Sequence, residues 1–222
     1  MCFWRLMSVF VVSVGIFSTV FAASVTQKPD QASASHTAKK NHFKKTDRLP
    51  AQAIKVDSPK QVMSAHSEDL RALMLALYES HPEELSKSAQ VGPREMTEWV
   101  FDGKFGWRFD GLQRLQDQQA LDLLFDEQFQ GDHVLALVVG LETSLFHGYG
   151  AENEFAIPAE QDMSRMQTLA CSLREFQKRY HGLISGPKAV PMLQEAASQQ
   201  LVSSTLDSIL QRIPSVSGQS CP

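Results

Sequence analysis

Apolar residues recur at spacings of three and four along most of the chain after residue 60, the pattern of amphipathic helices packed on one core. The stripe of Leu70, Leu73, Met74 and Leu77 is typical, and Ser67 is placed to cap its helix. Such stripes, separated by Gly, Pro and capping residues, predict about six or seven helices. We therefore expect a mainly α fold in which residues 61–222 form a single compact domain.

The pattern predicts a long helix that begins at Asp110 and ends before Gly131, because its apolar residues share one face and most of its acidic residues lie on the other. A second helix is expected to begin after the capping residue Asp132 and to end near Gly148–Gly150. A third amphipathic helix is expected to follow Asp162.

A period of two interrupts the helical pattern between residues 98 and 111. Aromatic side chains occupy Trp99, Phe101, Phe105 and Trp107, with an Asp-Gly pair between the two halves. This alternation predicts a small β-hairpin, in which a three-residue loop would bring the four rings to one face. The aromatic face closes over the helical core, or it forms a platform for a sugar ring or an apolar peptide.

The first 22 residues have the pattern of a secretory signal peptide, because Arg5 precedes an apolar stretch that ends in small residues before Ala23. The stretch is about 15 residues long, whereas a bilayer span needs about 20. An uncleaved membrane anchor is the alternative. Cleavage would leave a chain without a transmembrane helix, located in the periplasm or secreted.

Residues 23–60 contain few large apolar side chains and cannot bury enough surface to offset the entropy of ordering, so we expect a disordered tether. Residues 24–60 carry eight Lys/Arg and three Asp/Glu, whereas residues 61–222 carry twelve and twenty-two. The acidic domain gives no strong signal for nucleic-acid binding. The tether is a solvated linker, or it contacts an anionic surface through its basic cluster of Lys39, Lys40, Lys44 and Lys45.

Cys171 and Cys221 remain after signal cleavage, and an even pair in an oxidising compartment indicates a disulfide. Its loop of about 50 residues would contribute roughly 4 kcal/mol in the chain-entropy model. The sequence contains no Cys-x-x-Cys, His-Glu-x-x-His, Gly-x-Ser-x-Gly, phosphate-loop or dinucleotide motif. The pattern therefore implies neither a metal nor a cofactor.

The most apolar stretch beyond the N-terminus, residues 131–150, has an apolar run too short for a membrane span and indicates a buried core helix. Gly140 within it predicts the close approach of a neighbouring helix. Glu142 lies beside the apolar stripe. Three interpretations are open: Glu142 is exposed at the helix edge, paired with an arginine such as Arg165 or Arg174, or a general acid/base in a cleft.

The stretch GDHVLALVVGLETSLFHGYG and the Glu-Phe that follows it resemble a motif of uncharacterised exported bacterial proteins. In that family a Gly-Asp, an apolar helix, a Gly-Leu-x-Thr and a Glu-Phe recur. The resemblance would extend from about Met74 to Tyr180. It implies an exported, α-rich domain of unknown function, and it assigns no catalytic residue.

Two functional hypotheses follow. The first is a non-catalytic periplasmic domain that acts as an accessory protein and binds a protein or another component of the cell envelope. The second is an envelope hydrolase that acts on glycan or peptide, with Glu142 as acid/base and the Trp99/Trp107 face as substrate platform. The second hypothesis requires Glu142 to line an open cleft within reach of the aromatic residues.

Overall fold

A computed structural model describes residues 57–103, 106–151, 156–186, 190–214 and residue 221. The predicted signal peptide (residues 1–22), almost all of the predicted tether, and the basic cluster of Lys39, Lys40, Lys44 and Lys45 lie outside these residues. The chain divides into two units, Met1–Gln52 and Ala53–Pro222. The helices described below all belong to the second unit.

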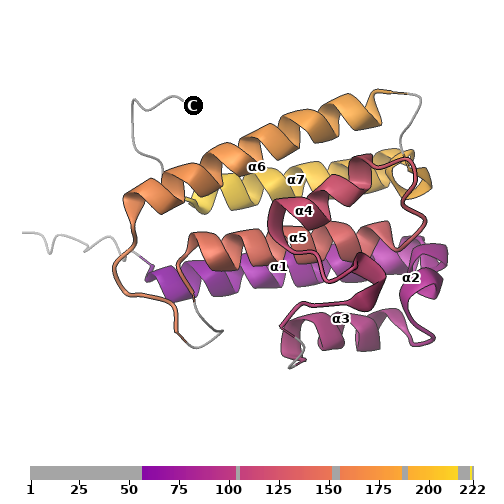
Figure 1. Ribbon diagram of the computed structural model, residues 1–222, viewed down its shortest axis with the longest axis horizontal. Helices are drawn as coiled ribbons and strands as arrows, with labels where there is room; N and C mark the ends of the chain where they lie inside the picture. The colour runs from indigo at the N-terminus through magenta and orange to yellow at the C-terminus, as the bar shows by residue number, and fades with distance from the viewer. Residues whose placement is uncertain (1–56, 104–105, 152–155, 187–189, 215–220, 222) are drawn as a thin grey trace, which may run out of the picture. The chain divides into compact units, whose positions relative to one another are not determined.

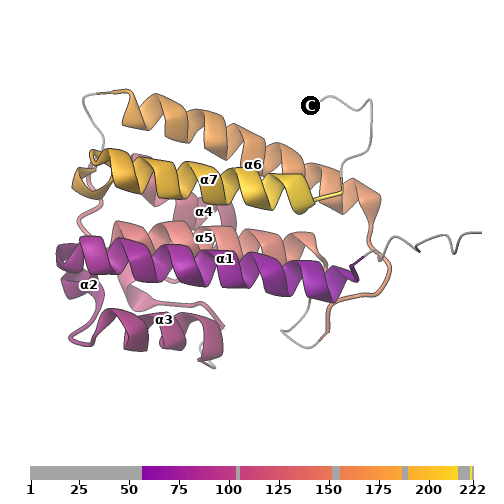
Figure 2. The ribbon, with the colours of Figure 1, turned by 180° about the vertical axis from the view of Figure 1, so that it is seen from behind.

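The described residues are mainly helical, as expected, and contain seven α-helices. Four long helices run side by side, with α1 and α6 each in contact with both α5 and α7 (Figures 1 and 2). The remaining helices pack around this group, α4 along α5 and α3 along α1. The helices are α1 (Pro59–Ser80), α2 (Pro82–Ser88), α3 (Pro93–Asp102), α4 (Asp117–Asp122), α5 (His133–Gly148), α6 (Met163–Ile184) and α7 (Ala196–Arg212), with 3-10 turns at Asp110–Leu112, Leu123–Phe125 and Pro191–Leu193.

Helix α1 begins two turns earlier than the sequence predicted. Ser58, not Ser67, is its capping residue: the Gln61 backbone N–H donates to Ser58 Oγ at 3.3 Å, and the Ser58 N–H donates to Gln61 Oε1 at 2.8 Å. Pro59 occupies the first helical position, where its missing N–H costs nothing. Ser67 therefore lies inside α1, on the side that meets α5.

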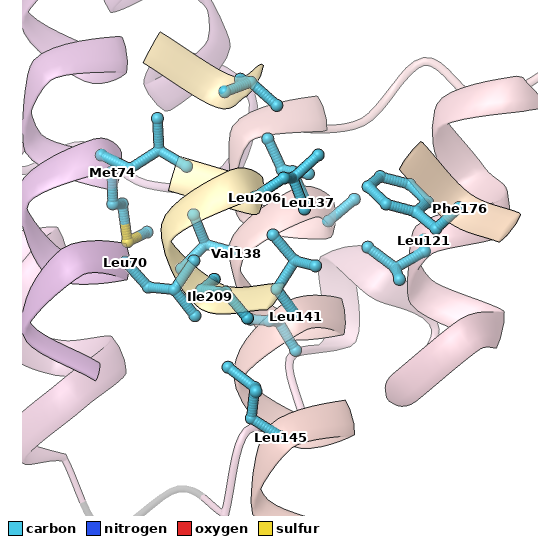
Figure 3. Close-up of a cluster of buried hydrophobic side chains, with 14 of the residues drawn as sticks. Leu70, Met74, Leu121, Leu137, Val138, Leu141, Leu145, Phe176, Leu206 and Ile209 are labelled. Atoms are coloured by element: carbon cyan, nitrogen blue, oxygen red, sulfur yellow. The ribbon is translucent and has the colours of Figure 1, made fainter. Parts of the chain in front are cut away.

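Helix α5 lies at the centre of the core, as its apolar sequence predicted. Thirteen of its sixteen residues are buried, and Asp132 caps it by accepting a hydrogen bond from the Leu135 N–H at 2.9 Å. Its leucines meet side chains of α1, α4, α6 and α7 (Figure 3). The approach of α4 that Gly140 predicted is confirmed, because a Cβ at this position would lie 2.6 Å from Leu121 Cγ.

The β-hairpin predicted between residues 98 and 111 is wrong, and no strand occurs among the described residues. Residues 93–102 form α3, which begins at Pro93. Its buried apolar residues, Met96 and Val100, are one helical turn apart, and this periodicity outweighs the aromatic alternation. Phe105 lies outside the described residues.

The single long helix predicted from Asp110 is also wrong. Gln113 and Arg114 adopt positive φ angles of 54° and 62°, which end the first short turn. Asp117, with a φ of 50°, starts α4, and its backbone N–H donates to Thr143 Oγ1 of α5 at 2.7 Å. Contacts with α5 therefore override the local helical pattern of this segment.

Among the described residues, no helix combines the length and the apolar character that crossing a bilayer requires. Cys171 of α6 and Cys221 lie within disulfide distance, with their Cα atoms 5.5 Å apart. This pairing would tie the end of the chain to the middle of α6.

We expect Gly140→Ala to lower the free energy of unfolding by about 1–2 kcal/mol. The roughly 1 kcal/mol gain in helix propensity is outweighed by the overlap of the new methyl group with Leu121. Gly182→Ala is the matched control, because Gly182 lies in α6 and a Cβ at this position would meet nothing within 4 Å, so the substitution should stabilise the protein by up to about 1 kcal/mol. Urea unfolding of both variants measures the difference, and equal effects would contradict this account.

Candidate functional site

The structure buries Glu142 in the contact between α1 and α5. Its side chain is 3 % exposed, and Ser67 Oγ of α1 donates a hydrogen bond to its Oε1 at 2.7 Å. The other oxygen, Oε2, has no hydrogen-bond partner among the described residues. Glu142 is therefore not exposed at the helix edge, and it forms no ion pair with Arg165, Arg174 or another described arginine.

Burial raises the pKa of Glu142 to about 7, because removal from water disfavours the ionised form. The hydrogen bond from Ser67 and the charge of Arg71 act in the opposite direction but do not outweigh burial. Near neutral pH the side chain is thus present both as an acid and as a carboxylate. A group poised in this way can donate a proton and later accept one.

Glu142 lines a cavity of about 190 Å³. This volume is below the usual range of about 300–1,000 Å³ for a complete ligand, so it suits one part of a larger molecule. The walls come from α1, α3, α5 and the loops around Trp107 and Ile157. The polar lining residues are Lys60, Ser64, Ser67, Arg71 and Glu142, and the apolar ones are Met63, Phe101, Trp107, Phe146 and Ile157.

The cavity brings together two of the four aromatic residues singled out in the sequence. Phe101 of α3 and Trp107 both line it, and the Trp107 ring packs edge-on against Phe146 of α5 with centroids 4.9 Å apart. Trp99 does not line it and is 40 % exposed, because it lies on a different face of α3 from Phe101. Of the four residues of the expected aromatic surface, the structure therefore brings together two, one from a helix and one from a loop.

Trp107 has two further properties of a binding residue. Its indole Nε1 is buried without a hydrogen-bond partner among the described residues. Its backbone has a φ of 55°, directly after Gly106 with a φ of 56°. A positive φ at a bulky residue is uncommon and costs strain, which contacts such as that of the Trp107 ring with Phe146 have to offset.

Sequence reasoning missed the roles of two residues in this site, Arg71 and Ser67. Arg71 of α1 donates from both Nη atoms to Asp102, at 2.8 and 2.7 Å, and its guanidinium lies over the Phe101 ring at 5.0 Å from the centroid. Ser67 holds Glu142. The sequence does contain a pattern that indicates both residues. Polar side chains recur at helical spacing along α1 and form one stripe, which consists of Lys60, Ser64, Ser67 and Arg71.

A second cluster of buried ionisable groups lies at the other end of α5. Although burial alone would raise the pKa of Glu84, hydrogen bonds from His133 and Lys87 lower it to about 2. The His133 N–H donates to Glu84 Oε2 at 2.9 Å, and Lys87 Nζ donates to Oε1 at 2.8 Å. Both carboxylate oxygens are satisfied, so this cluster joins α2 to α5 and offers no open position.

A second hollow, of about 440 Å³, lies on a different face of α5. There His147 Nδ1 lies 2.9 Å from both carboxylate oxygens of Asp117. His147 is thus engaged with Asp117 and does not reach the cavity around Glu142. Within the described part of the chain, no three His, Cys, Asp or Glu side chains are grouped to hold a metal ion.

The comparisons with known proteins give no match: no family model, no curated protein and no solved structure is significantly similar to the chain. The resemblance to exported bacterial proteins therefore stays a prediction.

We expect Glu142→Gln to stabilise the protein at high pH. Because the folded pKa of about 7 exceeds the unfolded value of 4.5, the wild-type protein loses stability as pH rises between these values, in total about 3 kcal/mol. The variant lacks this loss, so its advantage should grow by about that amount between pH 4 and pH 8. Denaturant unfolding at both values measures it.

Glu98→Gln, at an exposed position of α3, is the matched control and should show no comparable change with pH. A Glu142→Gln variant whose advantage over wild type is the same at pH 4 and pH 8 would contradict a buried, proton-binding Glu142.

Proposed function

We propose that the protein cleaves a glycan of the cell envelope, with Glu142 as general acid. The observation that carries this proposal is a buried carboxyl group, hydrogen-bonded through one oxygen only, in a cavity lined by aromatic rings. Its pKa of about 7 supports the role, because a general acid works best when its pKa is close to the working pH.

A glycosidic bond suits this cavity better than a peptide bond. The Phe101 and Trp107 rings line the cavity and suit the apolar side of a sugar, while the Trp107 indole N–H and the Glu142 carboxyl group, whose Oε2 has no partner among the described residues, suit its polar groups. Peptidases that use a serine or cysteine nucleophile pair that side chain with a base. Two serines line this cavity, but the described lining residues include no histidine that could act as their base. One of the two, Ser67, already donates a hydrogen bond to Glu142.

The geometry supports a reaction with one carboxyl group in two roles. Protonated Glu142 gives its proton to the glycosidic oxygen, the bond from that oxygen to the anomeric carbon breaks, and the leaving sugar departs as an alcohol. An aromatic ring can stabilise the positive charge that develops on the remaining sugar, and Trp107 is the lining residue proposed for this role, because the Phe101 ring already lies beneath the Arg71 guanidinium. Glu142, now a carboxylate, takes a proton from the water that attacks the anomeric carbon, which restores the acid.

The proposed location is the periplasm or the cell exterior. The signal-peptide pattern supports it, as do the paired cysteines and the absence of a spanning helix among the described residues. In this setting, the basic cluster of Lys39, Lys40, Lys44 and Lys45 would hold the protein near an anionic envelope polymer.

We expect Glu142→Gln to lower the rate of cleavage by about 10²–10⁴-fold, the contribution of a positioned general acid. The measurement is the release of new reducing ends from cell-wall glycan strands by the purified full chain. Wild-type activity should fall as pH rises through about 7, where Glu142 loses its proton.

Trp107→Phe should also weaken activity, since it removes the unpaired indole N–H, whereas Trp99→Phe is the matched control outside the cavity. A Glu142→Gln variant that cleaves the strands at the wild-type rate would overturn the proposal.

The second candidate function is non-catalytic binding, and one observation favours it. Glu142 is the one carboxylate among the described residues that line the cavity, whereas most glycosidases use two. The exposed Trp99 also offers an apolar contact for a protein partner. Binding of glycan strands by the wild-type protein without any release of reducing ends would decide for this candidate.

A further inference from the structure

Arg71 lies between two carboxylates, one buried and one at the surface. Its guanidinium is engaged in two hydrogen bonds to Asp102, the last residue of α3, whose side chain is 60 % exposed. It also lines the cavity that contains Glu142, and its charge acts on that carboxyl group. Oε2 of Glu142 nevertheless has no partner within the described structure.

The carboxylate with which Arg71 pairs decides whether Glu142 keeps its proton near neutral pH. An arginine paired with a carboxylate favours the ionised form and lowers its pKa by about 1–3 units. If Arg71 turned from Asp102 to Glu142, Glu142 would lose the proton that a general acid has to donate. A bidentate pair is the strongest geometry available to Arg71, so Asp102 competes effectively for it.

We propose that Asp102 is a positioning residue, which holds Arg71 in the bidentate pair and so keeps it off Glu142. This inference rests on the proposed function for its catalytic meaning, but the positioning itself can be measured without activity. The Phe101 ring beneath the guanidinium supports the same orientation of Arg71, because a cation over a ring face is attracted to it.

Among the described residues, few other charged groups could pair with Arg71 or act on Glu142. On α4, Asp117 is engaged with His147 and Asp122 with Arg179, and on α5 the next ionisable group, His147, faces the second hollow. Of the charged groups that the structure describes, Arg71 is the one that lowers the pKa of Glu142. Within the described part of the chain, Arg71 forms ion pairs with Glu68 of α1 and Asp102 of α3, and Lys60 of α1 is the other cation that lines the cavity.

The test is the titration of Glu142 in the full-length protein, followed by carbon NMR of labelled glutamate side chains and assigned with Glu142→Gln. In Asp102→Asn, we expect the midpoint of Glu142 to fall from about 7 by about one pH unit or more, because the released Arg71 pairs with it. The high-pH limb of the activity profile should move down with it. Asp110→Asn, which breaks the exposed pair with Arg114, is the matched control and should leave the midpoint unchanged.

The double variant Arg71→Gln/Asp102→Asn separates positioning from a direct effect of the Asp102 charge. We expect its midpoint to equal that of Arg71→Gln alone. An unchanged or higher midpoint of Glu142 in Asp102→Asn would overturn the inference. The inference would also fail if Asp102→Asn lowered this midpoint equally in the wild-type and the Arg71→Gln backgrounds. If Asp102→Asn lowers the midpoint but the wild-type protein cleaves no glycan, the positioning role stands and the proposed function is refuted. If the wild-type protein cleaves glycan but the midpoint does not move, the proposed function stands and the positioning role is refuted.

Discussion

The burial of α5 among its neighbours is the constraint on which the rest of the structure depends. Helices α1, α2, α4 and α6 all pack against it, and most of its side chains are removed from water. Apolar burial on this scale is the main stabilising contribution in such a domain. Every polar group that α5 carries into the core must then find a partner, and the chemistry of the protein depends on how each one does so.

The two ends of α5 meet this requirement differently. Near its start, Asp132 accepts hydrogen bonds from Tyr78 and Ser88 in addition to capping the helix, and Glu84 is fully bonded by its neighbours. Glu142 receives a single hydrogen bond from Ser67 and keeps one oxygen without a partner. A half-satisfied buried carboxyl costs stability, so its presence beside a cavity argues for function more strongly than burial alone would.

The sequence was a reliable guide where one periodicity dominated. The long stripes of α5 and α6 have no competing pattern, and their caps, Asp132 and Asp162, lie where the sequence placed them. The structure predicted for residues 98–116 was wrong for two physical reasons. A short helix with one buried turn was hidden by alternating aromatics, and the positive φ angles that follow are fixed by contacts with distant residues, which no local pattern records.

The same limit explains which parts of the site could be predicted. Glu142 was recognisable because a carboxylate beside an apolar stripe is locally anomalous. Its partner Ser67 lies 75 residues away, and it was interpreted as a cap because the true start at Ser58 was missed. With α1 extended to Pro59, its polar stripe falls opposite Glu142, where small and charged side chains leave the space that apolar residues would have filled. The missed start of α1 thus concealed the wall formed by Lys60, Met63 and Ser64, and with Ser67 taken as a cap its contact with Glu142 was concealed as well.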